Sequence, residues 1–146
     1  MKRLPIWFLL LVSAGACTSQ RVVSQPQTQV APALTVERFL QAANARDLAT
    51  MARLFGTRDG PIGDRERRQE VELRMDVIAE ILTHNDYQIV SEGPVPGADY
   101  PSRRIGVDLT LTSGVLVRDV GFILVSESAT RWLVNVIDVV KITQAG

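Results

Sequence analysis

The sequence predicts an α+β fold, in which helices at the front of one domain pack on an antiparallel sheet. Between residues 35 and 85, apolar residues recur with the helical period of 3.6. Between residues 87 and 143, they alternate with the period of 2 that is typical of strands. Because the strands follow the helices instead of alternating with them, an α+β arrangement is favoured over an α/β one.

Two helices are expected before residue 56. The first begins after Thr35, a residue type that is suited to N-cap a helix. Its apolar face has helical spacing and consists of Val36, Phe39, Leu40 and Ala43. Asp47 is suited to cap a second, short helix over residues 48–55, and Gly56 is typical of a helix end.

The longest helix is expected from Asp64 to Asn85, after a glycine-rich loop. Its predicted buried stripe consists of Val71, Met75, Ile78 and Leu82, widened by Leu73, Val77 and Ile81. His84, the only histidine, falls in the last predicted turn, where the helix dipole favours a cationic side chain.

Four strands are expected at residues 87–92, 103–112, 115–128 and 131–143. A loop with three prolines, residues 93–102, separates the first two, and Ser113 and Gly114 form a tight turn after the second. The second strand alternates most clearly, with its apolar side formed by Ile105, Val107, Leu109 and Leu111.

The first 16 residues have the three zones of an export signal. Lys2 and Arg3 are positively charged, and residues 4–12 form an apolar run that is shorter than the roughly 20 residues of a membrane span. Small residues then precede Cys17, the only cysteine in the chain. The pattern Ala14-Gly15-Ala16 is suited to the ordinary signal peptidase.

The stretch Leu11–Ser19, "LVSAGACTS", also resembles a bacterial lipobox, in which a cysteine after small residues becomes the lipid-bearing first residue of the mature chain. Ala14 stands where the usual lipobox has leucine. Lipidation would explain a lone cysteine that has no disulfide partner. We therefore expect a lipid anchor at Cys17 that holds an exported protein in the bacterial envelope, facing the periplasm. The alternative is a soluble periplasmic or secreted protein with a free thiol.

The chain is expected to have three parts: a signal peptide (1–16), a flexible tether (17–34) and one folded domain (35–146). The tether is rich in Gln, Ser, Thr and Pro, a composition typical of linkers. Loss of Lys2 and Arg3 with the signal leaves 14 basic against 16 acidic residues, so the net charge is near −2. This balance argues against a nucleic-acid partner, which requires clustered positive charge.

The segment "TVERFLQAANARDLATMARLF", Thr35–Phe55, and the order of helices before strands resemble the nuclear-transport-factor-2-like family. The resemblance implies a curved α+β cone with a pocket between the sheet and the helices. It also implies a fold that carries enzymes, binding modules and assembly domains alike. In this family, ketosteroid isomerase uses an aspartate of the fold as a general base.

Two aspartates interrupt apolar strand faces and are the candidate catalytic residues. Asp119 is expected on one side with apolar residues of its strand, and Asp138 on one side with Trp132 and the valines that follow it. A carboxylate in apolar surroundings can have a raised pKa and act as a base. The structural alternative is that each lies near a strand end or pairs with an arginine such as Arg118 or Arg131.

Three aromatic residues, Tyr87, Tyr100 and Trp132, are candidates for the lining of a pocket. The sequence has no motif for a cofactor and no clustered metal ligands, so neither is expected. The predicted function is a small binding or assembly module, whose partner is a small apolar ligand or another envelope protein, and a dimer is compatible with the sequence. The alternative is a small isomerase, dehydratase or hydrolase that uses a pocket aspartate on an apolar ligand.

Overall fold

The computed structural model describes residues 31–128 and 131–146, so the predicted signal, Cys17 and most of the tether lie outside the described residues. The elements follow in the order α1 (Pro32–Asn44), α2 (Leu48–Leu54), β1 (Gly56–Thr57), β2 (Gly60–Pro61), η1 (Ile62–Asp64), α3 (Arg68–Leu82), β3 (His84–Pro94), β4 (Ser102–Leu111), β5 (Leu116–Ser128), β6 (Arg131–Ile137) and α4 (Val139–Thr143). Strands β3 to β6 form one antiparallel sheet in sequence order. The predicted α+β fold with helices before an antiparallel sheet is therefore confirmed.

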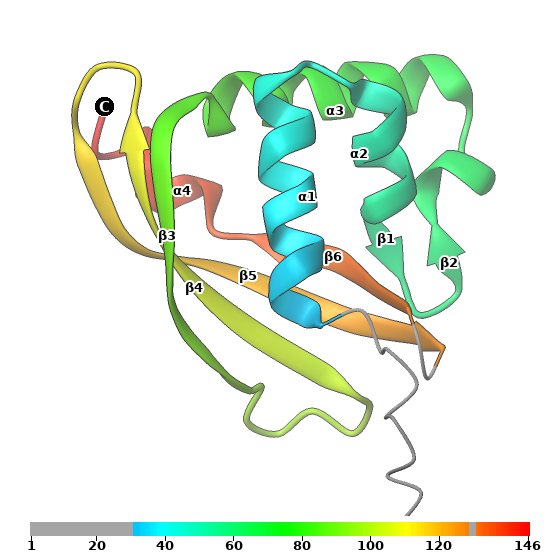
Figure 1. Ribbon diagram of the computed structural model, residues 1–146. Helices are drawn as coiled ribbons and strands as arrows, with labels where there is room; N and C mark the ends of the chain where they lie inside the picture. Colours follow the sequence, from blue (N-terminus) through cyan, green and yellow to red (C-terminus); the bar gives the residue numbers. More distant parts are fainter. Residues whose placement is uncertain (1–30, 129–130) are drawn as a thin grey trace, which may run out of the picture.

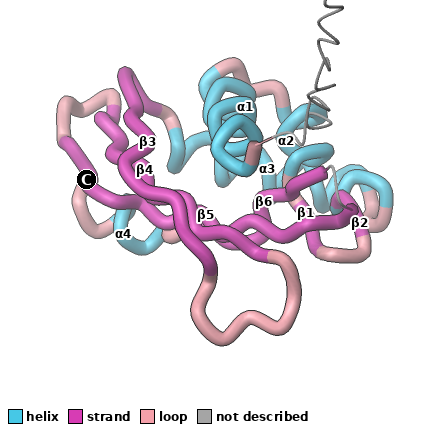
Figure 2. Tube along the Cα trace, turned by 60° about the horizontal axis from the view of Figure 1, so that its bottom comes forward, coloured by secondary structure: helices cyan, strands magenta, loops and turns pink. Residues whose placement is uncertain are grey.

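The helices and the sheet form two layers. Figures 1 and 2 show α1, α2 and α3 together on one side of the curved sheet. The short α4 contacts β5 and α3 near the C-terminus. The two-residue strands β1 and β2 form a hairpin that follows α2, and a parallel bridge between Phe55 and Val134 places this hairpin beside β6.

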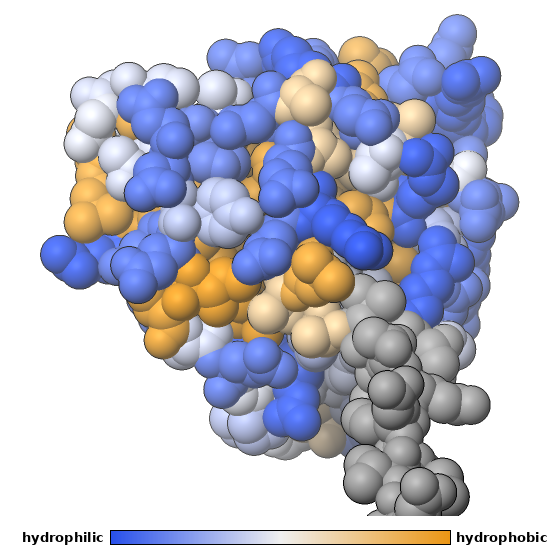
Figure 3. Space-filling view, viewed as in Figure 1, coloured by the Kyte–Doolittle hydropathy of each residue, from blue (hydrophilic) through white to orange (hydrophobic). Residues whose placement is uncertain are grey.

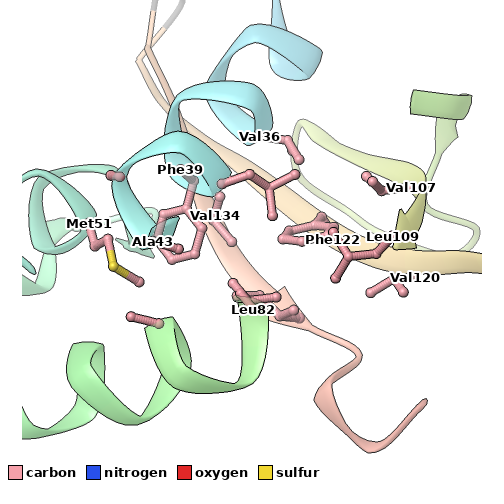
Figure 4. Packing of buried hydrophobic residues seen from close by; sticks show 14 of the residues in the cluster. Val36, Phe39, Ala43, Met51, Leu82, Val107, Leu109, Val120, Phe122 and Val134 are labelled. Carbon is pink, nitrogen blue, oxygen red and sulfur yellow. The ribbon is translucent and has the colours of Figure 1, made fainter. Parts of the chain in front are cut away.

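The space between the two layers is filled by apolar side chains. Figure 4 shows Phe39 of α1, Leu82 of α3 and Phe122 of β5 directed into this interior. All three are completely buried, as are Leu109 of β4 and Met51 of α2. Full burial of a side chain of this size contributes about 1.5–3 kcal/mol, so this interior is the main source of the domain's stability.

Helix α1 begins at Pro32, four residues before the start after Thr35 that the sequence predicts. Proline is favoured in the first turn of a helix because its φ is already helical and its missing N–H would have no partner there. Thr35 is therefore not the N-cap but a buried residue of α1. The predicted cap of the next helix is confirmed, since Asp47 Oδ1 accepts a hydrogen bond from the backbone N of Thr50 at 3.0 Å.

Helix α3 is shorter than predicted at both ends. Residues 62–64 form the 3₁₀ turn η1, and the chain leaves the helix at Thr83 so that His84 begins β3. The buried stripe contains Val71, Met75, Ala79 and Leu82. Leu73 and Val77, which were expected to widen this stripe, are 70% and 59% exposed. At 100° per residue, Leu73 lies about 200° from Val71 and so faces solvent.

The last predicted strand is divided in two. Strand β6 ends at Ile137, and residues 139–143 form α4 instead of continuing to Thr143 as a strand. The carboxylate of Asp138 accepts a hydrogen bond from the backbone N of Lys141 at 3.2 Å, which is the N-cap bond of this helix. Strand β3 is longer than the predicted 87–92, and the loop before β4 is shortened to 95–101.

Candidate functional site

Both candidate carboxylates lie away from the filled interior, on the face of the sheet opposite α1 to α3. In β4, the buried Ile105 and Val107 point toward the helices, so Gly106 between them faces the other way. A side chain at Gly106 would overlap Asp119 Oδ1 and Ser91 Oγ. The Asp119 carboxylate therefore lies over the outer face of the sheet, beside a position that only glycine can occupy without displacement.

A β-bulge places Asp119 there. Val107 pairs with Val120 and Leu109 with Val117, so Asp108 of β4 faces two residues of β5, Arg118 and Asp119. Asp119 has a φ of 50°, in the left-handed region that aspartate tolerates better than most residues. The Asp108 carboxylate accepts a hydrogen bond from the backbone N of Asp119 at 2.8 Å, which satisfies a donor that the bulge would leave unpaired.

Arg104 holds the Asp119 carboxylate through two hydrogen bonds. Its Nη1 lies 3.0 Å from Oδ1, and its Nη2 lies 2.9 Å from Oδ2. Lys141 Nζ donates to the carbonyl oxygen of Asp119 at 2.9 Å. The Arg104 hydrogen bonds hold the pKa of Asp119 below its usual range, and they raise the pKa of Arg104 in turn. Asp119 is therefore a stable carboxylate and lacks the raised pKa that a general base requires.

Asp138 contributes to the same group of charges around Arg104 as Asp119, but the two aspartates have different structural roles. Asp138 caps α4, and its negative charge is one of the causes that raise the pKa of Arg104. We call Arg104, Asp108, Asp119, Asp138 and Lys141 the outer-face cluster. Neither aspartate pairs with the predicted partners: Arg118 binds Asp108 instead, and Arg131 binds Glu127. The cluster fixes the bulge and the start of α4, which are structural tasks.

The three aromatic candidates divide between two places. Tyr87 lies edge-on to His84, with 5.5 Å between the ring centroids, and packs against the interior. Tyr100 and Trp132 instead line a common hollow of about 380 Å³, which we call the rim hollow. It is lined by Pro94, Val95, Ala98, Tyr100, Pro101, Ser102, Arg103 and Trp132.

The rim hollow lies at one end of the sheet. Ser102 begins β4 opposite Val125, near the end of β5, and Trp132 near the start of β6 pairs with Ser126. Figure 1 shows these strand ends and the β1–β2 hairpin at the same end of the molecule. Figure 3 shows a separate apolar area on the helix side, between α1 and strands β3 and β4.

A second hollow of about 360 Å³ adjoins the first at Tyr100. It is lined by Thr57, Arg58, Asp59, Tyr100, Val125 and Asn135. The guanidinium carbon of Arg58 lies 5.0 Å from the centroid of the Tyr100 ring, within the range of a cation–π contact. Tyr100 thus lines both hollows, with Arg58 in the lining of one and Arg103 in the lining of the other.

Sequence reasoning did not find Arg58, Ser102 or Arg103. All 16 acidic residues of the chain are among the described ones, yet no carboxylate oxygen lies within 4.0 Å of a side-chain nitrogen of Arg58 or Arg103. The Oγ of Ser102 is buried and has no hydrogen-bond partner in the described structure. The proline-rich loop before Ser102 was the available signal, because loops of this kind often border binding sites.

His84 belongs to a structural contact. Its backbone N donates to Asn44 Oδ1 at 3.1 Å, and its backbone O accepts from Asn44 Nδ2 at 3.0 Å. Its ring Nδ1 lies 2.7 Å from the carbonyl oxygen of Leu82. Asn44 therefore ties the end of α1 to the first residue of β3.

Within residues 31–128 and 131–146, no group of three or more His, Cys, Asp and Glu residues is placed to hold a metal ion. None of the helices in that part of the chain is long and apolar enough to cross a membrane. Comparisons of the chain with protein-family models, curated proteins and solved structures give no match. The site must therefore be interpreted from its own geometry.

Proposed function

We propose that the chain is an exported, lipid-anchored binding or assembly module of the bacterial envelope, with Cys17 as the lipidated first residue of the mature protein. We further propose that its domain is a member of the nuclear-transport-factor-2-like cones. The order of three helices before a four-stranded antiparallel sheet supports this fold assignment. So does the segment 35–55, which carries the resemblance and lies in α1 and α2.

The observation that carries the proposal is the position and pairing of Asp119. An enzyme of this class would need a base inside a pocket between the helices and the sheet. Among the described residues, those buried between the helices and the sheet are largely apolar and include no aspartate or glutamate, and Asp119 lies outside this interior in an ion pair with Arg104. The hollows at the end of the sheet offer aromatic rings and guanidinium groups, which bind and orient a ligand without transferring a proton.

Titration of the two candidate carboxyls by ¹³C NMR tests the choice between binding module and enzyme. We expect Asp119 to titrate below the usual range of an aspartate, because Arg104 stabilises its charged form. The Arg104→Gln variant is the matched control, in which the Asp119 value should return toward about 3.9. A value well above 3.9 for Asp119 or Asp138 in the wild type would contradict the proposal and support an enzyme.

Cell fractionation tests the anchor. The wild-type chain is expected in the membrane fraction, and Cys17→Ser is expected in the soluble fraction, because it lacks the acyl chains that contribute about 0.8 kcal/mol per buried CH₂. Ser19→Ala, two residues away, should remain in the membrane. A wild-type chain that is soluble and keeps an unmodified thiol would rule out the anchor without affecting the carboxyl titration.

A further inference from the structure

We propose that the rim hollow binds a small apolar acid, whose hydrocarbon body packs on Tyr100 and Trp132 and whose carboxylate is held by Arg103. The proposal rests on the proposed function as a binding module and names the chemical class of its ligand. It places the ligand at the end of the sheet and not between the helices and the sheet.

The shape and lining of the hollow fit a small molecule. Its volume of about 380 Å³ falls within the range of roughly 300–1,000 Å³ that is typical of small-molecule sites. Two prolines, Pro94 and Pro101, restrict the backbone of the loop that forms one wall. Tyr100 and Trp132 supply aromatic surface for an apolar group.

The charges favour an anion. Arg103 lines the hollow and has no carboxylate partner among the described residues, and Arg58, which also has none, lies 5.0 Å from the centroid of the Tyr100 ring. Nearby acids do not compensate for these two arginines. Asp59 pairs with Arg65 at 3.2 Å, and Asp99 lines neither hollow although it lies in the loop. A planar guanidinium with free N–H groups is the usual partner of a carboxylate.

Ser102 forms part of the wall of the rim hollow. Its side chain is nine-tenths buried, it lines the rim hollow, and its Oγ has no hydrogen-bond partner in the described structure. Buried hydroxyl groups are nearly always hydrogen-bonded in native proteins. Because Ser102 and Arg103 are successive residues of β4, their side chains point to opposite faces of the sheet, so the proposal depends on Arg103 and the two aromatic rings and not on Ser102.

The chain offers an internal probe for this site. Its two tryptophans are Trp7, in the predicted signal, and Trp132, in the rim hollow. With Trp7→Phe, Trp132 is the only tryptophan of the chain whether or not residues 1–16 are removed. Its fluorescence can be followed while N-acetyl-L-phenylalanine is added to the chain in phospholipid nanodiscs. The matched neutral compound is N-acetyl-L-phenylalaninamide, which has the same ring and no carboxylate.

We expect a saturable change in Trp132 emission with the acid and about fivefold weaker binding of the amide, as expected for one partly exposed ion pair. Arg103→Gln should remove this preference. Arg38→Gln, at another exposed arginine without a carboxylate partner, should leave it unchanged. Equal binding of acid and amide, no saturable response to the acid, or a preference that survives Arg103→Gln would each overturn the proposal. A low Asp119 pKa in the same protein would leave the binding-module proposal in place, so that only the ligand assignment would have failed.

Discussion

The outer-face cluster depends on a pair of glycines, and one alanine substitution tests this dependence. Gly106 of β4 and Gly121 of β5 face each other across the strands, and the Arg104 guanidinium lies over both. In Gly106→Ala, the new methyl group would overlap Asp119 Oδ1 and Ser91 Oγ. The Asp119 side chain would have to move, and its two bonds to Arg104 would be lost.

The expected cost has three contributions. The ion pair is worth about 0.2–1 kcal/mol, because the side chains of Arg104 and Asp119 are 36% and 50% exposed. Overpacking in a tight site costs about 1–3 kcal/mol. Replacement of a strand glycine by alanine stabilises the fold by about 0.5–1 kcal/mol, because glycine loses more conformational freedom on folding. Taken at their midpoints, these contributions predict that Gly106→Ala lowers the free energy of unfolding by about 2 kcal/mol.

Two further alanine variants provide the controls for a urea-unfolding series. In Gly121→Ala, the nearest atom is Arg104 Nη2 at 3.3 Å, and this flexible side chain can move, so stability should change little. In Gly93→Ala, nothing lies within 4 Å of the new methyl group, so stability should stay equal or rise by up to about 1 kcal/mol. If Gly106→Ala were as stable as Gly93→Ala, the geometry described for Asp119 would be wrong.

Three other predictions follow from single contacts. Asn44→Ala should lower the free energy of unfolding by about 1–2 kcal/mol in urea, because it leaves the backbone N–H and C=O of His84 without their partner. Leu73→Ala should change it by less than about 0.5 kcal/mol, whereas Met75→Ala should cost about 2–5 kcal/mol, because only Met75 is buried. Asp119 has a lowered folded-state pKa, so its contribution is present above the unfolded value and is lost as the pH falls through the folded one. In thermal unfolding, the wild type should therefore lose more stability than Asp119→Asn when the pH is lowered from about 5 to 3, by less than about 1 kcal/mol.

The fold class could be predicted because it depends on long periodic segments. The helical spacing from Val36 to Ala43 and the alternation from Ile105 to Leu111 each extend over several residues, and every one of these apolar positions is buried. The ends of the elements depend on local hydrogen bonds that periodicity does not report. The start of β3 at His84 is set in this way, whereas the start of α1 depends on Pro32, whose φ is already helical.

The rim hollow could be predicted only in part, since it combines residues that are far apart in the sequence. Tyr100 and Trp132 are identifiable from the sequence as candidates for the lining of a pocket, but their proximity depends on the register that pairs β4 with β5 and β5 with β6. Arg58 comes from the β1–β2 hairpin, whose place beside β6 is fixed by the bridge between Phe55 and Val134. No pattern within one segment indicates such a contact.

The two candidate bases show why an aspartate on an apolar strand face is an ambiguous signal. A short carboxylate is favoured where the backbone takes up the left-handed region and also where a helix begins, and both features interrupt a strand. Asp119 has the first role and Asp138 the second. For Asp138, the sequence held a distinguishing sign: Val139 and Ile142 are three residues apart, which is helical spacing and not strand alternation. An aspartate with helical spacing directly after it should therefore be interpreted first as a cap. By this criterion, Asp138 is interpreted as a helix cap from the sequence alone, and Asp119 remains the one candidate base that the structure has to test.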